Sequence, residues 1–229
     1  MTNIVIKKDT FKRILSDVKD IIKNPMEDEN IFYNHDEKNI LKGYAMIIGP
    51  KDTCYHNGFF FFEFNFPNDY PWSPPKIIYK TNDGITRFNP NLYRDGKVCL
   101  SILNTWKGEC WSSCQTIRSV LFVLQSILNN NPLLNEPGIT PTHSDVKPYK
   151  KMIKYKSYEH ALYKQYISDN GVFEIFRDDI KKYFINNKQT IINELSKHSK
   201  NSIETIKCQF YNMTITIDYD SLILKFKEI

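Results

Sequence analysis

Six apolar residues near the start of the chain recur at the spacing of one helical face: Phe11, Ile14, Leu15, Val18, Ile21 and Ile22. They predict a helix over residues 9–23, which Asn24-Pro25 would end. Strand-like segments follow over residues 31–33, 41–48, 59–66 and 76–79. Short connections between them favour antiparallel neighbours, because parallel strands need a longer crossover. The pattern predicts a four-stranded antiparallel sheet flanked by helices.

The third strand segment alternates, which places one row of aromatic side chains on a single face that should meet the core: Phe60, Phe62, Phe64 and Phe66. The stretch over residues 66–75 contains four prolines and therefore cannot be a central strand. We expect a stiff loop there, with Tyr70-Pro71 as a candidate cis peptide bond.

Helical periodicity returns in the second half of the chain, over residues 115–128, 146–168, 172–184 and 188–196. A long segment without clear period, residues 81–104, precedes the first of these helices. Long ordered loops inside a domain are usually functional. The chain is therefore predicted to form one α+β domain over residues 1–168. A helical C-terminal extension over residues 169–229 would pack on or beside that domain.

The 229 residues are 41% hydrophobic and 25% charged, which is ordinary for a folded protein. No apolar run approaches the roughly 20 residues that a membrane-spanning helix needs. Residues 1–8 are polar and basic, without the apolar core of a secretory signal. We therefore expect a soluble intracellular protein without membrane association, cytoplasmic with the nucleus as a second compartment.

The five cysteines are an odd number, and without a secretory signal they are expected to be free thiols. Cys110 and Cys114 form a CxxxC pair, so a zinc site has to be considered. A structural zinc site needs four ligands, and neither a second pair nor a suitably spaced histidine accompanies these two. The sequence therefore predicts no metal site.

The net charge of +5 lies entirely in the last third of the chain. Residues 1–146 hold 16 basic and 16 acidic residues, whereas residues 147–229 hold 15 and 10. The densest cluster consists of Lys147, Lys150, Lys151, Lys154 and Lys156. It predicts a solvated helix face, with a phosphate-binding or acidic-partner patch as the alternative. Nucleic-acid binding is a weaker alternative, because no nucleic-acid motif accompanies the lysines.

The most informative segment for chemistry is residues 87–103, in which Cys99 follows Asn89-Pro90-Asn91 across an Asp-Gly turn. A cysteine in a loop can be exposed enough to act as a nucleophile, and an amide from the same loop can reach it. The alternative is a buried structural cysteine beside a turn.

At this point the chain resembles the ubiquitin-conjugating enzymes. The resemblance includes Gly49-Pro50, Phe66-Pro67, Asp69-Tyr70-Pro71, and Trp111-Ser112 before the helix at residues 115–128. It is closest to the Z-type enzymes of this family, which it matches in Arg87-Phe88-Asn89-Pro90-Asn91, the insertion at residues 103–111, the loop at residues 135–138 and the stretch at residues 218–223. The resemblance implies the ubiquitin-conjugating fold over the predicted α+β domain.

The resemblance further implies that Cys99 carries ubiquitin, or a ubiquitin-like modifier, as a thioester. An activating enzyme would supply the modifier, and a substrate lysine or a ligase cysteine would receive it. No cofactor is needed, because ATP is consumed earlier by the activating enzyme. Asn91 would donate to the oxyanion or brace the loop, while Asn89 replaces a mostly structural histidine. Glu136 is the candidate for orienting the incoming lysine, against the alternative of a solvated loop charge.

For partners, the resemblance implies that Trp72 is an aromatic anchor for ligases, against the alternative of a half-buried loop residue. Ser112 belongs to a ligase-contact loop that departs from the family's Ser-Pro-Ala, which puts binding of common RING-type ligases in doubt. Lys12 and Arg13 resemble the basic first-helix residues that meet the activating enzyme, although a solvated helix face would look the same. A non-catalytic ubiquitin-binding scaffold of the same fold remains the alternative function.

Overall fold

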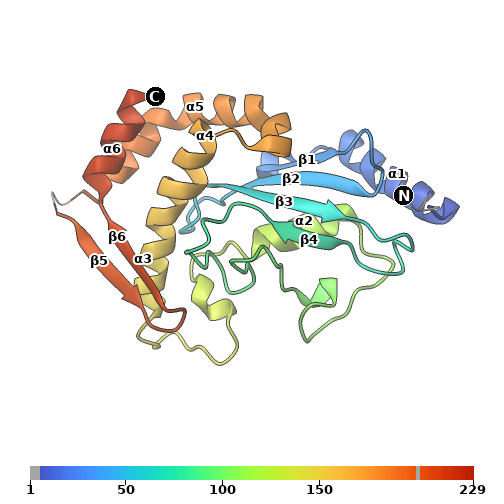
Figure 1. Ribbon diagram of the computed structural model, residues 1–229, viewed down its shortest axis with the longest axis horizontal. Coiled ribbons are helices and arrows are strands. Elements are labelled where there is room, and N and C mark those ends of the chain that lie inside the picture. The colour runs from blue at the N-terminus through green and yellow to red at the C-terminus, as the bar shows by residue number, and fades with distance from the viewer. Residues whose placement is uncertain (1–5, 200–201) are drawn as a thin grey trace.

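The computed structural model describes residues 6–199 and 202–229 (Figure 1). Its centre is an antiparallel sheet of four strands in the order β1-β2-β3-β4. The strands are β1 (Ile31–His35), β2 (Lys42–Ile48), β3 (Phe59–Asn65) and β4 (Lys76–Tyr79). The sheet that the sequence predicted is therefore confirmed in number of strands, order and direction.

The helices before and beside the sheet are α1 (Lys8–Lys23), α2 (Ile117–Ser126) and three short helices, η1 (Glu27–Glu29), η2 (Ser101–Leu103) and η3 (Pro132–Asn135). The later helices are α3 (Val146–Lys156), η4 (Ser157–Lys164), α4 (Gln165–Ile167), η5 (Gly171–Phe176), α5 (Arg177–Ser196) and α6 (Tyr219–Glu228). The helical segments α3, η4 and α4 follow one another without a break and match the helix predicted over residues 146–168. Two helices predicted after residue 172 are one helix, α5.

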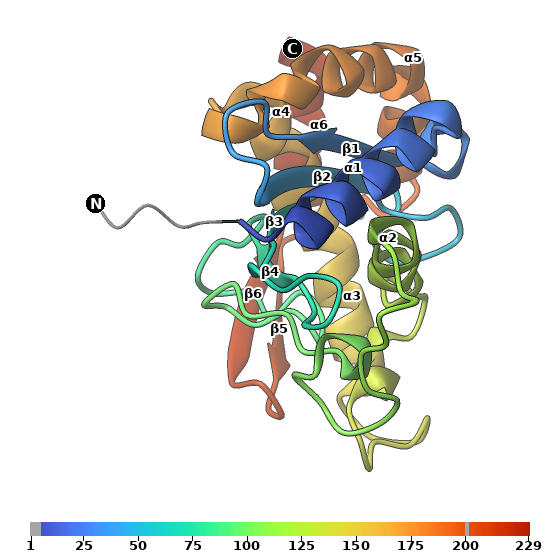
Figure 2. The ribbon, with the colours of Figure 1, turned by 90° about the vertical axis from the view of Figure 1, so that its right-hand side faces the viewer.

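Strand β3 is buried on both faces. Phe60, Phe62 and Phe64 lie in the core, as their alternation predicted. On the opposite face, the Phe61 ring stacks on Phe173 of η5 with centroids 4.8 Å apart, and Phe59 meets Tyr183 of α5 edge to face. Figure 1 shows α5 above the sheet, and Figures 1 and 2 together place α2 behind β3 and β4. The C-terminal extension therefore covers the second face of β3. The alternation of Phe60, Phe62 and Phe64 alone would leave that face open to solvent.

The extension also contains a two-stranded hairpin that the sequence analysis did not predict. Strands β5 (Glu204–Cys208) and β6 (Met213–Ile217) pair antiparallel. Figures 1 and 2 show the hairpin beside α3. The inward side chains of β6, namely Met213, Ile215 and Ile217, are buried, while Thr214 and Thr216 are exposed. The expectation of a purely helical extension is wrong for these residues.

Candidate functional site

The loop that carries Cys99 is closed by backbone pairing. Leu92 bridges to both Asn89 and Val98, and the Cys99 N–H donates to the carbonyl of Asn91 at 2.9 Å. Gly96 makes the turn between these segments with φ of +88°, a conformation that side-chain-bearing residues rarely adopt. The loop is therefore a small, ordered platform on which Asn91 and Cys99 are direct neighbours.

Asn89 locks this platform to the core. Its side chain is fully buried, and its amide nitrogen donates to the Tyr55 hydroxyl and to the Ile127 carbonyl, each at 2.8 Å. Its side-chain oxygen accepts from the Asn91 N–H at 2.9 Å and from the Asn135 amide at 3.4 Å. Every polar group of this amide therefore has a partner inside the protein. Asn89 thus has a structural role.

The Asn91 side chain is turned toward the cysteine backbone. Its amide nitrogen donates to the carbonyl oxygen of Cys99 at 2.7 Å. In this structure Asn91 therefore braces the loop, which is one of the two roles considered for it. An amide nitrogen has two hydrogens, so the second remains available for an acceptor near the thiol.

The Cys99 thiol is covered, contrary to the expectation of an exposed nucleophile. The residue is 2% exposed, and Sγ lies 2.8 Å from the carbonyl oxygen of Thr105. Thr105 is itself held by its hydroxyl, which donates to Val98 and accepts from the Leu100 N–H. The start of the insertion at residues 103–111 therefore lies directly against the thiol.

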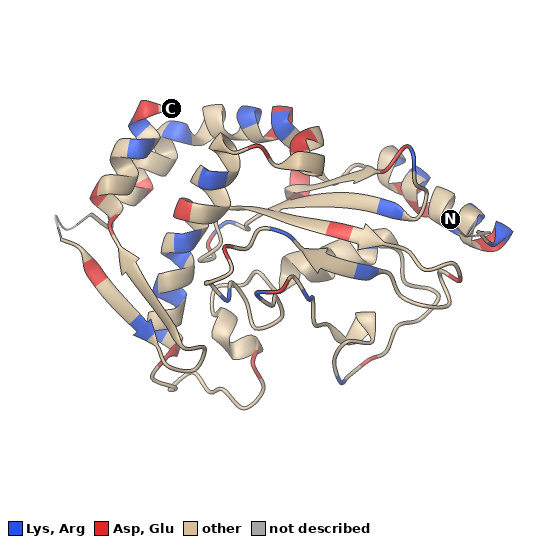
Figure 3. Cartoon of the chain, viewed as in Figure 1, with Lys and Arg blue, Asp and Glu red and all other residues tan. Residues whose placement is uncertain are grey.

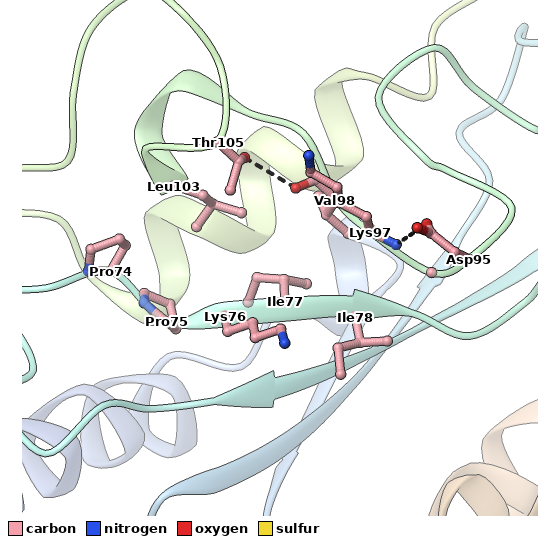
Figure 4. Close-up of a pocket in the computed structure, with 11 residues that line it drawn as sticks. Pro74, Pro75, Lys76, Ile77, Ile78, Asp95, Lys97, Val98, Leu103 and Thr105 are labelled. Carbon is pink, nitrogen blue, oxygen red and sulfur yellow. Dashed lines mark hydrogen bonds between the residues drawn. The ribbon is translucent and has the colours of Figure 1, made fainter.

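Two cavities lie on either side of this cover. Cys99, Asn91, Glu136 and Trp106 share the lining of a pocket with space of only about 10 Å³, close to one water-sized sphere. A cavity of about 500 Å³ lies between β4 and residues 95–105, as Figure 4 shows. Its lining includes Thr105 but not Cys99. Thr105 therefore contacts the thiol and also lines a much larger empty space.

Glu136 and Cys99 line the same pocket, so the structure brings the predicted acidic residue into the pocket of the thiol. One of its carboxylate oxygens accepts a hydrogen bond of 2.5 Å from the Tyr211 hydroxyl. Burial, and then the hydrogen bond to Glu136, raise the pKa of Tyr211 well above its usual value. Glu136 is therefore held in place by the extension and is not a freely solvated loop charge.

Tyr211 lies in the turn of the β5–β6 hairpin, and sequence reasoning missed it together with its supports. The Tyr211 carbonyl accepts from the Arg94 guanidinium at 2.9 Å. The Arg87 guanidinium lies 3.3 Å from the centroid of the Tyr93 ring and 5.4 Å from that of Tyr211. The alternation of residues 204–208 and 213–217 is the sequence signal that could have revealed this hairpin.

Three of the four residues predicted to meet partners are exposed. Trp72 follows the cis peptide bond Tyr70-Pro71 and is 73% exposed, so it is not a half-buried loop residue. Ser112 and Lys12 are also exposed. These three side chains are free to meet another protein, and the roles assigned to them stay predictions.

Arg13 is bound inside the chain, which corrects the expectation of a free basic group on the first helix. Its guanidinium donates to the carbonyls of Ser113 and Gln115 at 2.7 and 2.6 Å. It also pairs with Asp17 at 2.9 Å. Asp17 in turn accepts from the Tyr70 hydroxyl at 2.5 Å. Arg13 therefore fixes α1 to the loop that contains Ser112.

Cys110 and Cys114 are exposed free thiols. Within residues 6–199 and 202–229, no group of three His, Cys, Asp or Glu side chains is arranged to hold a metal ion. In the same part of the chain, no helix is both long and apolar enough to cross a membrane.

The sheet, the braced cysteine loop and the following helix define the class of protein. A family model described as "Ubiquitin-conjugating enzyme" matches residues 13–157. The chain belongs to the ubiquitin-conjugating enzyme family, as its motifs indicated.

Within this family, the chain is similar to ubiquitin-conjugating enzyme E2 Z. It is 43% identical to the human protein over 153 residues, which are 66% of this chain and 43% of that protein. For the Xenopus tropicalis protein the identity is 44% over 153 residues, covering 66% and 48%. The probable ubiquitin-conjugating enzyme protein 17 of Caenorhabditis elegans is 34% identical over 202 residues, covering 82% and 27%. The chain thus spans less than half the length of these relatives.

Proposed function

We propose that this chain accepts ubiquitin, or a ubiquitin-like modifier, as a thioester on Cys99 and passes it to a lysine or to a ligase cysteine. The observation that carries the proposal is the shared pocket of Cys99, Asn91 and Glu136, in a domain that matches the family. The partners are an activating enzyme before this step and a ligase after it. The reaction takes place in the cytoplasm, with the nucleus as a second compartment.

In the first step the Cys99 thiolate attacks the thioester carbonyl that the activating enzyme presents, and the thiolate of that enzyme leaves. A thiol with a usual pKa of about 8.5 is only a few per cent ionised at neutral pH, yet it is a good nucleophile. In the second step a lysine amine attacks the new thioester and the Cys99 thiolate leaves. No metal or cofactor takes part in either step.

We infer two roles in the second step, one for Asn91 and one for Glu136. The free hydrogen of the Asn91 amide stabilises the oxyanion that forms when the amine attacks, which is typically worth about 3 kcal/mol. The Glu136 carboxylate lines the same pocket and accepts the proton or orients the amine. Both side chains are held by hydrogen bonds before the substrate arrives.

The covered thiol adds a conformational step to the reaction. For Cys99 to be charged, the segment at Thr105 and Trp106 moves away from Sγ and breaks the contact of 2.8 Å between Sγ and the Thr105 carbonyl. The cavity of about 500 Å³ on the far side of Thr105 gives this segment room to move. The closed arrangement is thus a resting state that partner binding opens.

The same cover is the one observation that favours the second candidate, a non-catalytic ubiquitin-binding scaffold. The two candidates differ in a charging experiment with activating enzyme, ATP and ubiquitin. An enzyme forms an adduct that a thiol reductant removes, whereas a scaffold forms none.

A further inference from the structure

Helix α3 has two chemically different faces. Tyr149, Met152 and Ile153 are fully buried in the core. The other face presents lysines from successive turns, namely Lys147, Lys150, Lys151 and Lys154. Figure 3 shows this run of basic residues along the helix. Because the rise is 1.5 Å per residue, the run spans about 10 Å along the axis.

This basic face is walled in by other elements of the fold. On one side lies a cavity of about 340 Å³, whose far wall includes Glu204 of β5 and Ile217 of β6. On the other side lies a cavity of about 410 Å³, lined by residues 51–54, His56 and the end of α5. Lys150, Lys154 and His198 line both cavities, which are therefore neighbours. A helix face that simply meets solvent would have no such walls.

The walls add positive charge to that of the helix. Lys51, from the loop after β2, and Lys197, at the end of α5, line the second cavity. Together the two cavities collect six lysines against three carboxylates, which are Asp52, Glu194 and Glu204.

Two of these carboxylates are already engaged. Glu204 pairs with Lys151, while Glu194 accepts from the Tyr158 hydroxyl at 2.6 Å and lies 3.6 Å from His56. Among the described residues, neither Lys150 nor Lys154 forms an ion pair. Burial, with the nearby Lys150 and Lys197, lowers the pKa of Lys154 even though Glu194 opposes this. Lys150 and Lys154 therefore line both cavities without a carboxylate of their own in the described part of the chain. Perturbed and unpaired charged groups in a cavity are typical of a binding site.

We propose that this double cavity binds a compact, soluble anion that carries several phosphate groups. Its two halves have the volumes of small-molecule sites. Lysine ammonium groups from three segments of the chain suit phosphates that branch from a small scaffold, because each phosphate can accept charge-assisted hydrogen bonds from more than one lysine. The site uses no residue of the Cys99 pocket, so it is independent of the proposed transfer reaction.

A single-stranded nucleic acid fits this site less well. Such ligands need a groove that follows the backbone and aromatic faces on which bases stack. The aromatic residues here are Tyr158 and Tyr219, and both are buried. An acidic peptide would need an extended groove and finds two recessed cavities instead. Both ligands are nevertheless included in the test.

The test is a titration of the whole chain with inositol hexakisphosphate and with tripolyphosphate, used as probes of the ligand class. We expect saturable binding by calorimetry and a rise in Tm of several degrees, because a ligand that binds only the folded state stabilises it. Replacing two lysines together, Lys150→Gln with Lys154→Gln, should weaken binding at least about tenfold, since two charge-assisted contacts are lost. Without ligand, this variant should be as stable as the parent or more stable, because repulsion is relieved.

The matched control is Lys225→Gln with Lys227→Gln, which removes the same charge from two exposed positions of α6. It should bind the probes as the parent does. Three results would overturn the proposal. These are equal weakening in both double variants, the same Tm shift with sulfate at equal ionic strength, and equal or stronger binding of an RNA oligonucleotide or a poly-glutamate peptide at equal anion concentration.

Discussion

The Tyr211 hydroxyl donates a hydrogen bond of 2.5 Å to the Glu136 carboxylate, across 75 positions of the chain. Glu136 lies in the pocket of Cys99, and Tyr211 lies in a hairpin turn of the extension beyond the residues that the family model matches. The extension thus reaches the centre of the proposed reaction. This contact explains how a loop carboxylate is held at a fixed position beside the thiol.

Glu136→Gln should slow the transfer of modifier from charged Cys99 to free lysine. The amide still accepts a hydrogen bond from Tyr211, so the pocket keeps its shape while the proton acceptor is lost. General-base groups typically contribute about 100-fold or more. The measurement is single-turnover discharge of the isolated thioester at several lysine concentrations. Tyr211→Phe, which leaves the carboxylate but frees it, should have a smaller effect. An unchanged rate of discharge in Glu136→Gln would show that the residue has only a structural role.

Asn91→Ala should leave charging of Cys99 intact and slow the attack by lysine. Loss of an oxyanion donor costs about 3 kcal/mol, or roughly a hundredfold in rate. Charging and discharge are measured separately with the same preparation. Since Asn91 also bonds to the Cys99 carbonyl at 2.7 Å, an equal loss in both steps would show that it acts only as a brace.

Thr105→Val should expose the Cys99 thiol. The change keeps the shape of the side chain but removes the hydroxyl that bonds to Val98 and to the Leu100 N–H. With these two bonds lost, we expect alkylation of Cys99 to become roughly thirtyfold faster, because each bond is worth about 1 kcal/mol.

Peptide mass spectrometry separates the label on Cys99 from that on the exposed Cys110 and Cys114. Thr105→Ser keeps the hydroxyl and serves as the control, with alkylation close to that of the parent. If Thr105→Val and Thr105→Ser react at the same rate, the hydroxyl does not hold the cover in place.

Folding stability should fall when the pH drops below about 6.5, the usual pKa of histidine. Burial lowers the pKa of four histidines, namely His35, His56, His160 and His198. These groups stay neutral in the folded state while the unfolded chain takes up protons, so acid favours unfolding. Urea unfolding at pH 7.5 and pH 5.5, in buffers without phosphate, should show the lower stability at pH 5.5.

A substitution at His160 isolates one contribution to this dependence. Its Nε2 atom is buried and has no hydrogen-bond partner among the described residues. His160→Gln should therefore flatten the change of stability with pH, whatever it does to stability at pH 7.5. The same slope in the variant and the parent would mean that His160 does not contribute to it.

The core sheet could be predicted from the sequence because side chains that face the core alternate along its strands, and this pattern is local. The spacing of Phe60, Phe62 and Phe64 places them on one face of the strand, and that face lies in the core. The hairpin of the extension was missed because its turn, residues 209–212, contains neither Gly nor Pro, and Asn212 supplies the positive φ of 48°. Its strands gain their stability from packing on α3, which local propensity does not reveal.

The sequence pointed to three residues that share one pocket, Cys99, Asn91 and Glu136, but not to their conformation. The motif around Cys99 identified the residue, while its cover depends on how the insertion folds back on Val98 and Leu100. Glu136 was a candidate because it lies in the loop after the second helix. Its hydrogen-bond donor, Tyr211, is 75 positions away in the sequence. Arg13 looked like a surface charge, because its acceptors are backbone carbonyls about 100 positions later in the chain. Contacts of this range arise from tertiary structure and leave no local pattern.

The most direct test of the account is a charging assay. The protein is mixed with activating enzyme, ATP and ubiquitin, and with a ubiquitin-like modifier in parallel. We expect an adduct on Cys99 that a thiol reductant removes, and a reductant-resistant ester when Cys99 is replaced by Ser. Absence of any adduct with either modifier, or an adduct that survives in Cys99→Ala, would contradict this expectation.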